Sequence, residues 1–157
     1  MEHTFLQHFL YPSTLFASKE PYLVSTILGS CISVCLYDPV LKIGGMNHYM
    51  LPNWTGNDLV SPKYGNVAIE KLIEKMLSMG SKKSNLNAKV FGGGELLSPE
   101  KSGLRIGQRN IKVAEMMLAE HKIPIVASST GGPQGRKILF NTGTGEVRHK
   151  FLVKTQN

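Results

Sequence analysis

The stretch from Cys31 to His48 constrains the fold of this chain more than any other part of the sequence. Two apolar runs flank Asp38-Pro39-Val40-Leu41, and an Asp-Pro pair favours the start of a turn. A four-residue hairpin loop at those positions places Cys35 opposite Gly44 and Cys31 opposite His48. Cross-strand partners have Cβ atoms about 4.5–5.5 Å apart, which lets a thiol and an imidazole share a proton. The pattern therefore predicts a Cys–His nucleophile pair, provided that no bulge moves the two side chains to opposite faces.

The residues before Cys31 supply the rest of a nucleophilic site. A bend at Gly29-Ser30 brings the backbone N–H groups of Ser30 and Cys31 near the sulfur, where an oxyanion needs donors. The imidazole can take the thiol proton and later return it to a leaving amine. A third group usually fixes the imidazole tautomer, and the hydroxyl of either Thr26 or Ser25 is a candidate.

Cysteine usage argues against other roles for the two thiols. Cys31 and Cys35, on one strand, would lie about 13 Å apart, beyond the Cα separation of about 7 Å that a disulfide tolerates. Their spacing also differs from Cys-x-x-Cys, the spacing of redox and zinc sites. Because Cys35 has no facing histidine, we expect it to be a buried structural residue.

Length and composition indicate one folded domain, residues 1–157, whose first 22 residues have no clear structural pattern. The 157 residues are 41% hydrophobic and 18% charged, and no apolar run is long enough to span a membrane. The N-terminus lacks the basic and apolar regions of a signal peptide, so we expect a cytoplasmic protein without membrane insertion.

The net charge of +7 favours an acidic partner. The basic residues are dispersed and have no interleaved aromatic residues, so we expect no nucleic-acid binding. The histidines show no metal-ligand spacing, and Gly92-Gly93-Gly94 lacks the pattern of a phosphate-binding loop. We therefore expect no metal, nucleotide or organic cofactor.

Periodicity predicts an α+β fold with more strands than helices. A helix after Ser61-Pro62 would bury Ile69, Leu72 and Met76 and end at Gly80. Its charged residues are interpreted as a solvated face. A second helix spans about 109–121. The expected strands or apolar runs cover 23–27, the two arms of the 31–51 hairpin, 88–91, 123–128, 137–140 and 147–153. Without regular βαβ alternation, the strands should be mixed and largely antiparallel.

Several motifs together resemble the CheD family of chemoreceptor glutamine deamidases. They cover about residues 20–150 and read Leu28-Gly29-Ser30-Cys31, Leu36-Tyr37-Asp38-Pro39, Gly44-Gly45-Met46-Asn47-His48-Tyr49-Met50-Leu51-Pro52, Tyr64-Gly65-Asn66-Val67-Ala68, Ala88-Lys89-Val90-Phe91-Gly92-Gly93, Ile106-Gly107-Gln108-Arg109-Asn110, and Gly131-Gly132 with Gly135-Arg136. The sequence departs from the family pattern at Gly94, where alanine is usual, and at Ser129, where an acidic residue is usual.

The resemblance implies a fold and a reaction. The implied fold is a single-domain α/β/β layered sandwich, with two main helices. The implied catalytic residues are Cys31 as nucleophile, His48 as base and Thr26 as third member, with Ser25 as the fallback. The implied reaction converts glutamine to glutamate on methyl-accepting chemotaxis receptors, with release of ammonia.

The implied partners leave two alternatives open. Family members are expected to bind a CheC-type phosphatase, so this chain could serve mainly as a chemotaxis adaptor. It could also be a thiol hydrolase that acts on another acyl substrate.

Overall fold

The computed structural model describes residues 5–96 and 105–153. In chain order its elements are β1 (Leu6–Phe9), β2 (Thr14–Ser18), β3 (Tyr22–Leu28), β4 (Ile32–Asp38), β5 (Ile43–His48), α1 (Gly65–Ser78), η1 (Lys83–Asn85), β6 (Asn87–Gly92), α3 (Ile106–Glu120), β7 (Ile125–Thr130), β8 (Arg136–Asn141) and β9 (Val147–Phe151).

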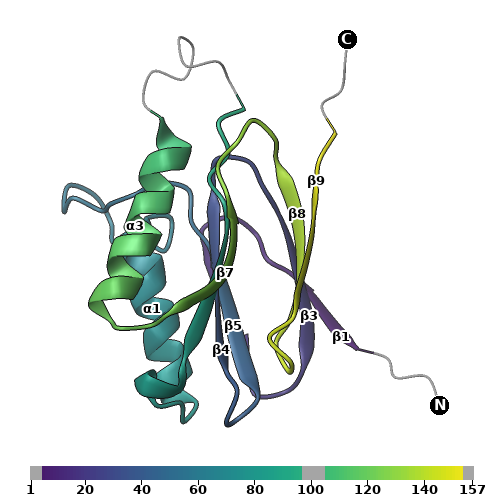
Figure 1. Ribbon diagram of the computed structural model, residues 1–157. Coiled ribbons are helices and arrows are strands. Elements are labelled where there is room, and N and C mark those ends of the chain that lie inside the picture. The colour runs from purple at the N-terminus through teal and green to yellow at the C-terminus, as the bar shows by residue number, and fades with distance from the viewer. Residues whose placement is uncertain (1–4, 97–104, 154–157) are drawn as a thin grey trace.

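The elements form three layers (Figure 1). One sheet, called sheet A, has the strand order β1-β3-β8-β9, and the other, sheet B, has the order β2-β5-β4-β6-β7. Helices α1 and α3 cover one face of sheet B, and sheet A packs on its other face. Only the pairs β1–β3 and β6–β7 are parallel among the described strands. The predicted α/β/β sandwich with largely antiparallel strands is thus confirmed.

Side chains that alternate along β4 pack into two separate apolar cores. Val34 and Leu36 point to the helix layer, where the predicted stripe of α1 is buried. Cys35 points the other way, into the layer between the two sheets, and packs there with Met46 and Phe140. Burial on both faces explains why β4 reads as an almost unbroken apolar run.

The predicted hairpin register is wrong by two positions. Cys35 lies opposite Met46 rather than Gly44, and Asp38 pairs with Ile43. The loop still has four residues, but it spans 39–42 instead of 38–41. Because side chains alternate with a period of two, a shift of two positions moves partners along the strand without changing their face.

The side chain of Asp38 explains the displaced loop. Its Oδ1 accepts hydrogen bonds from the backbone of Val40 at 2.8 Å and of Leu41 at 3.1 Å. Lys42 closes the turn with a left-handed φ of 56° and donates its N–H to Asp38 O. An aspartate that caps its own turn in this way remains part of the strand.

The other sequence predictions differ from the structure mainly at element boundaries. Both long helices and the 137–153 hairpin are confirmed, with ends that shift by a few residues. Residues 1–22, which had no assignment, carry β1 and β2. These strands are short and partly exposed, so they lack a strong apolar pattern. The apolar run 123–128 becomes β7, which lies at the edge of sheet B.

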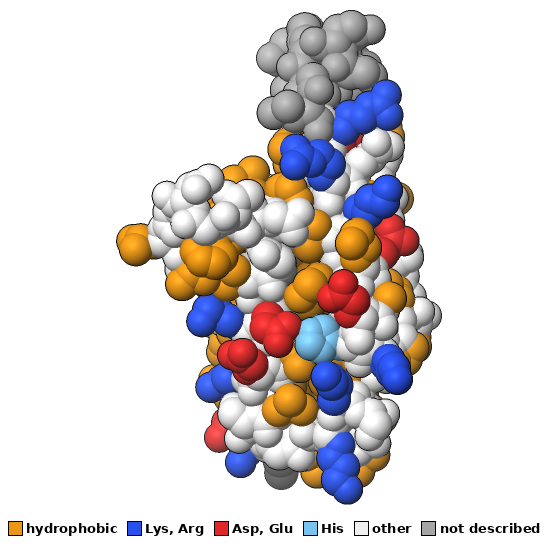
Figure 2. Space-filling view, turned by 90° about the vertical axis from the view of Figure 1, so that its left-hand side faces the viewer, with side chains coloured by type: hydrophobic (Ala, Val, Ile, Leu, Met, Phe, Trp, Pro, Cys, Tyr) orange, Lys and Arg blue, Asp and Glu red, His pale blue; other side chains and the backbone are white. Residues whose placement is uncertain are grey.

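The outer face of the helix layer is charged, as expected. Glu70, Lys71, Glu74 and Lys75 are all exposed on α1, and Figure 2 shows side chains of both signs interspersed on this face. Within the described ranges, no helix has the length and apolar character that crossing a bilayer requires.

Candidate active site

The predicted site residues come from neighbouring ends of strands in the two sheets. Thr26 lies near the end of β3 in sheet A, and His48 is the last residue of β5 in sheet B. Cys31 lies in the short connection that carries the chain from β3 to β4, and so from one sheet to the other. Thr26 and His48 are buried, whereas Cys31 is half-buried.

Thr26, one of the two upstream hydroxyls considered from the sequence, lies against His48. Its Oγ1 is 2.8 Å from His48 Nδ1 and 2.7 Å from the backbone oxygen of Leu10. A carbonyl only accepts, so the single hydroxyl hydrogen of Thr26 goes to Leu10. Thr26 must then accept from Nδ1–H, which leaves Nε2 of the neutral ring without a proton and able to act as a base.

Burial keeps both groups of the candidate pair neutral. Desolvation lowers the pKa of His48 to about 4, although hydrogen bonding to the Leu10 backbone opposes this effect. Desolvation raises the pKa of the Cys31 thiol, with partial opposition from a hydrogen bond to its own backbone N–H. At neutral pH the free site therefore holds a thiol and an imidazole, and the thiolate must form during attack.

Cys31 and His48 are diagonal neighbours rather than directly opposed. Cys35 pairs with Met46 and Ile32 with Tyr49, so His48 lies opposite Ser33. Ser33 follows Cys31 by two positions and is on the same face of the strand. Diagonal neighbours are typically about 7–8 Å apart between Cα atoms. Among the described residues, no hydrogen bond joins the Cys31 sulfur to His48. Catalytic hydrogen bonds are often long before substrate binds.

The backbone around Cys31 offers free donors. Within the described part of the chain, the N–H groups of Ser30 and Cys31 donate to no backbone acceptor, and the Cys31 N–H has only its own sulfur as a partner. The neighbouring carbonyls are held in place, since Gly93 N–H donates to Cys31 O and Gly94 N–H donates to Gly29 O, both at 2.9 Å. The loop is thus fixed by its acceptors, while two donors stay available for an oxyanion.

Gly92 explains how two backbones approach so closely beside the nucleophile. Its φ is +110°, and a Cβ at this position would collide with the carbonyl of Cys31. Only glycine accepts both conditions without strain. The triple glycine is therefore a place of close backbone contact.

Three buried polar atoms lack a hydrogen-bond partner among the described residues, and all belong to residues around this site. They are Ser33 Oγ, Asn47 Nδ2 and Asn110 Oδ1. Ser33 follows Cys31 by two positions, Asn47 precedes His48, and Asn110 contacts the Ser30 carbonyl. Unsatisfied buried groups are costly, and proteins tend to retain them at functional sites.

Comparisons with known proteins support the family. A family model described as CheD chemotactic sensory transduction matches residues 50–151, more than half of the chain. A relative from Sulfurimonas denitrificans is 45% identical over 94% of this chain and 96% of its own length. A second, from Trichlorobacter lovleyi, is 48% identical over 90% of this chain and 88% of its own. The chain belongs to the CheD family.

Both relatives are named probable chemoreceptor glutamine deamidase CheD. The family model begins after His48, so it does not cover Cys31 or His48. The match to the first relative covers 94% of this chain and therefore includes both residues. Among solved structures, a Bacillus licheniformis hypothetical protein, YfiH, covers 72% of this chain and 50% of its own, with 15% identity and a TM-score of 0.46.

The second cysteine of this CheD-family chain is more deeply buried than the first. Cys35 is only 1% exposed, and burial raises the pKa of its thiol far above that of an ordinary cysteine. Both cysteines are free. Within the described residues, no group of three or more His, Cys, Asp or Glu side chains could hold a metal ion.

The two residues that depart from the family pattern, Gly94 and Ser129, each have defined local contacts. A Cβ on Gly94 would lie 2.9 Å from the Gln134 carbonyl, so a side chain there needs a shift of the facing loop. Ser129 Oγ accepts from Arg136 Nε at 3.0 Å, and Arg136 also donates to Gly131 O at 2.7 Å. Ser129 therefore helps Arg136 to hold the glycine loop beside the site.

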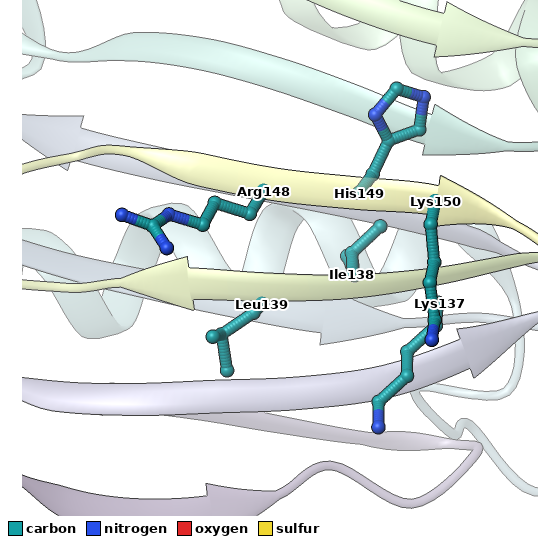
Figure 3. Close-up of a pocket in the computed structure, with 6 residues that line it drawn as sticks. All are labelled: Lys137, Ile138, Leu139, Arg148, His149 and Lys150. Atoms are coloured by element: carbon teal, nitrogen blue, oxygen red, sulfur yellow. The ribbon is translucent and has the colours of Figure 1, made fainter.

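A basic hollow lies on the outer face of sheet A (Figure 3). Lys137 and Lys150 are cross-strand partners there, next to Leu139 and Arg148. His149 points to the other side of the strand, where its Nε2 lies 3.0 Å from Ser129 Oγ. Lys137 also pairs with Ile27, close to the end of β3 that leads into Cys31.

Sequence reasoning missed Asn110, which lies on the buried face of α3. Its Nδ2 contacts the carbonyls of Ser30 and Met50. A polar residue on the same helix face as Gly107 and Ala114 was the available signal, because such a face is normally apolar.

Proposed function

We propose that this chain hydrolyses the side-chain amide of glutamine residues in chemotaxis receptors, with Cys31 as nucleophile and His48 as base. The observation that carries the proposal is the Thr26–His48 hydrogen bond, which leaves Nε2 as the basic nitrogen on the face that Cys31 shares. The names of the relatives supply the substrate class. The resulting glutamates would be available for methylation.

The first half of the reaction forms a thioester. His48 takes the proton of Cys31 as the sulfur attacks the carboxamide carbon, so a neutral pair becomes a nucleophile and an imidazolium only in the transition state. The carbonyl oxygen gains negative charge and is met by the N–H groups of Ser30 and Cys31. His48 then gives its proton to the departing nitrogen, ammonia leaves, and an acyl-Cys31 thioester remains.

The second half regenerates the thiol. His48 Nε2 is again unprotonated and takes a proton from water, whose oxygen attacks the thioester carbon. The C–S bond breaks, the proton returns to Cys31, and the product is a glutamate side chain. Thr26 accepts from Nδ1–H throughout and stabilises the imidazolium that forms in each half.

The basic hollow on sheet A suits an acidic substrate surface. Lys137 and Lys150 face each other without an acidic partner among the described residues, whereas Arg148 is paired with Glu146. A helix rich in glutamate beside the target glutamine would complement this charge. The hollow lies on β8 and β9, next to the strand that leads to the nucleophile.

The test uses purified receptor cytoplasmic fragments and mass spectrometry. The wild-type chain is expected to raise the mass of specific glutamine peptides by about one dalton and to release an equal amount of ammonia. Either of two results would contradict the proposal and support an alternative function. Binding to receptors and to a CheC-type phosphatase without conversion supports the adaptor function. Inert receptors together with thiol-dependent turnover of another acyl compound support a different hydrolase.

A further inference from the structure

Asn110 is a buried amide that joins the two catalytic segments. It is fully buried, and its Nδ2 lies 3.0 Å from Ser30 O and 3.0 Å from Met50 O. Ser30 precedes the proposed nucleophile, and Met50 follows the proposed base by two positions. Both partners are carbonyls that only accept, so the two amide hydrogens must point at them and the orientation of the side chain is fixed.

Helix α3 is itself anchored at Asn110. The hydroxyl of Tyr49 donates to Asn110 O at 2.6 Å, and Tyr49 is fully buried. One turn earlier, Gly107 approaches the carbonyls of Gly93 and Gly94 so closely that no Cβ would fit. The amide of Asn110 is therefore presented from a rigid position, without a flexible loop between it and the site.

The peptide unit between Ser30 and Cys31 links the hydrogen bond of Asn110 to the direction of the Cys31 N–H. A peptide bond is planar and trans, so the carbonyl of Ser30 and the N–H of Cys31 lie in one plane and point in opposite directions. A hydrogen bond that fixes Ser30 O also fixes the direction of the Cys31 N–H. We infer that Asn110 is a positioning residue that aims the Cys31 N–H at the oxyanion formed at Cys31; that oxyanion role rests on the function proposed above.

The unpaired oxygen of the same side chain supports this role. Asn110 Oδ1 is buried and has no hydrogen-bond partner among the described residues. A residue that served packing alone would not leave a polar atom unsatisfied, because an apolar side chain of similar shape avoids that cost. The chain retains the amide, whose two donors are both directed at the catalytic segments.

Two reagents that attack the same sulfur separate oxyanion stabilisation from general damage to the site. p-Nitrophenyl acetate acylates the thiol through a tetrahedral oxyanion, whereas iodoacetamide alkylates it by direct displacement and forms none. Both rates are measured on the full chain for wild type, Asn110→Ala and Tyr49→Phe, with Cys31→Ala as background. The matched control is Asn141→Ala, which removes an amide that caps the β8–β9 turn at the far end of sheet A.

Asn110→Ala is expected to slow acylation between several-fold and about 100-fold, the larger value being the effect of losing one oxyanion donor outright, with alkylation kept within about twofold. Asn141→Ala should leave the ratio of the two rates unchanged. A parallel fall in both rates, or no change in acylation, overturns the inference. If Asn110→Ala does not fold, Tyr49→Phe, which keeps the ring, is the deciding variant. Its acylation rate should fall several-fold while its alkylation rate stays unchanged. An unchanged ratio of the two rates overturns the inference.

Neither reagent requires a receptor, so the two proposals fail separately. A wild-type chain that shows the Asn110 effect but leaves receptor glutamines intact contradicts the proposed substrate and supports the positioning role. A chain that deamidates receptors with equal kcat in wild type and Asn110→Ala contradicts the positioning role alone.

Discussion

The buried neutral imidazole of His48 predicts a specific loss of stability in acid. Its pKa is about 4 in the folded chain and about 6.5 when exposed. Between these values the unfolded chain binds more protons than the folded one, so the free energy of unfolding falls as the pH drops through that window. The full difference of about 2.5 pKa units corresponds to about 3 kcal/mol, of which about 2 kcal/mol is lost between pH 7 and pH 5.

Urea unfolding at pH 7 and pH 5 measures this loss, and His48→Gln isolates it. Glutamine keeps an N–H donor that can reach Thr26, but it does not titrate in this range. Wild type should therefore lose about 2 kcal/mol more than His48→Gln over the two pH units. Equal losses in both proteins would refute the argument, because other groups would then account for the whole pH dependence.

The remaining predictions concern the site and its surroundings. Thr26→Val should lower kcat by about 10²-fold or more because the tautomer of the base is no longer fixed, while Thr26→Ser should retain most activity; steady-state kinetics on receptor fragments measure both. Iodoacetamide should label Cys31 and leave Cys35 unmodified in the folded chain, with a rate that still rises above pH 9, since burial raises the pKa of the Cys31 thiol. A plateau below pH 7 would contradict the neutral pair. Lys137→Glu combined with Lys150→Glu should raise KM for receptor fragments with little change in kcat, and added salt should weaken wild type in the same direction.

Periodicity was sufficient to predict most of the helices and strands, because each amphipathic element has one face to bury, whereas the layered arrangement was predicted from the family resemblance. The stripe of α1 predicted its buried face, and the apolar run of β4 predicted a strand. The register of the β4–β5 hairpin was beyond such reasoning. It depends on whether Asp38 caps the turn from inside the strand and on the left-handed conformation of Lys42, which are local choices with small energy differences.

The site was predictable only where its residues are close in the sequence or match a family motif. Cys31 and His48 lie on adjacent segments, so a local pairing argument could bring them together. Thr26 belongs to the other sheet, and its contact with His48 depends on how the two sheets pack. Asn110 comes from a helix about 80 positions later in the chain, and no local pattern indicates which carbonyl its amide meets.

The central claim is that Cys31 carries the acyl group during glutamine hydrolysis. Its most direct test compares wild type, Cys31→Ala and Cys35→Ala in the conversion of glutamine to glutamate on receptor fragments, followed by mass spectrometry. The account predicts full loss of conversion in Cys31→Ala, near wild-type conversion in Cys35→Ala, and a thioester on Cys31 in acid-quenched wild-type reactions. Equal conversion by wild type and Cys31→Ala would contradict it.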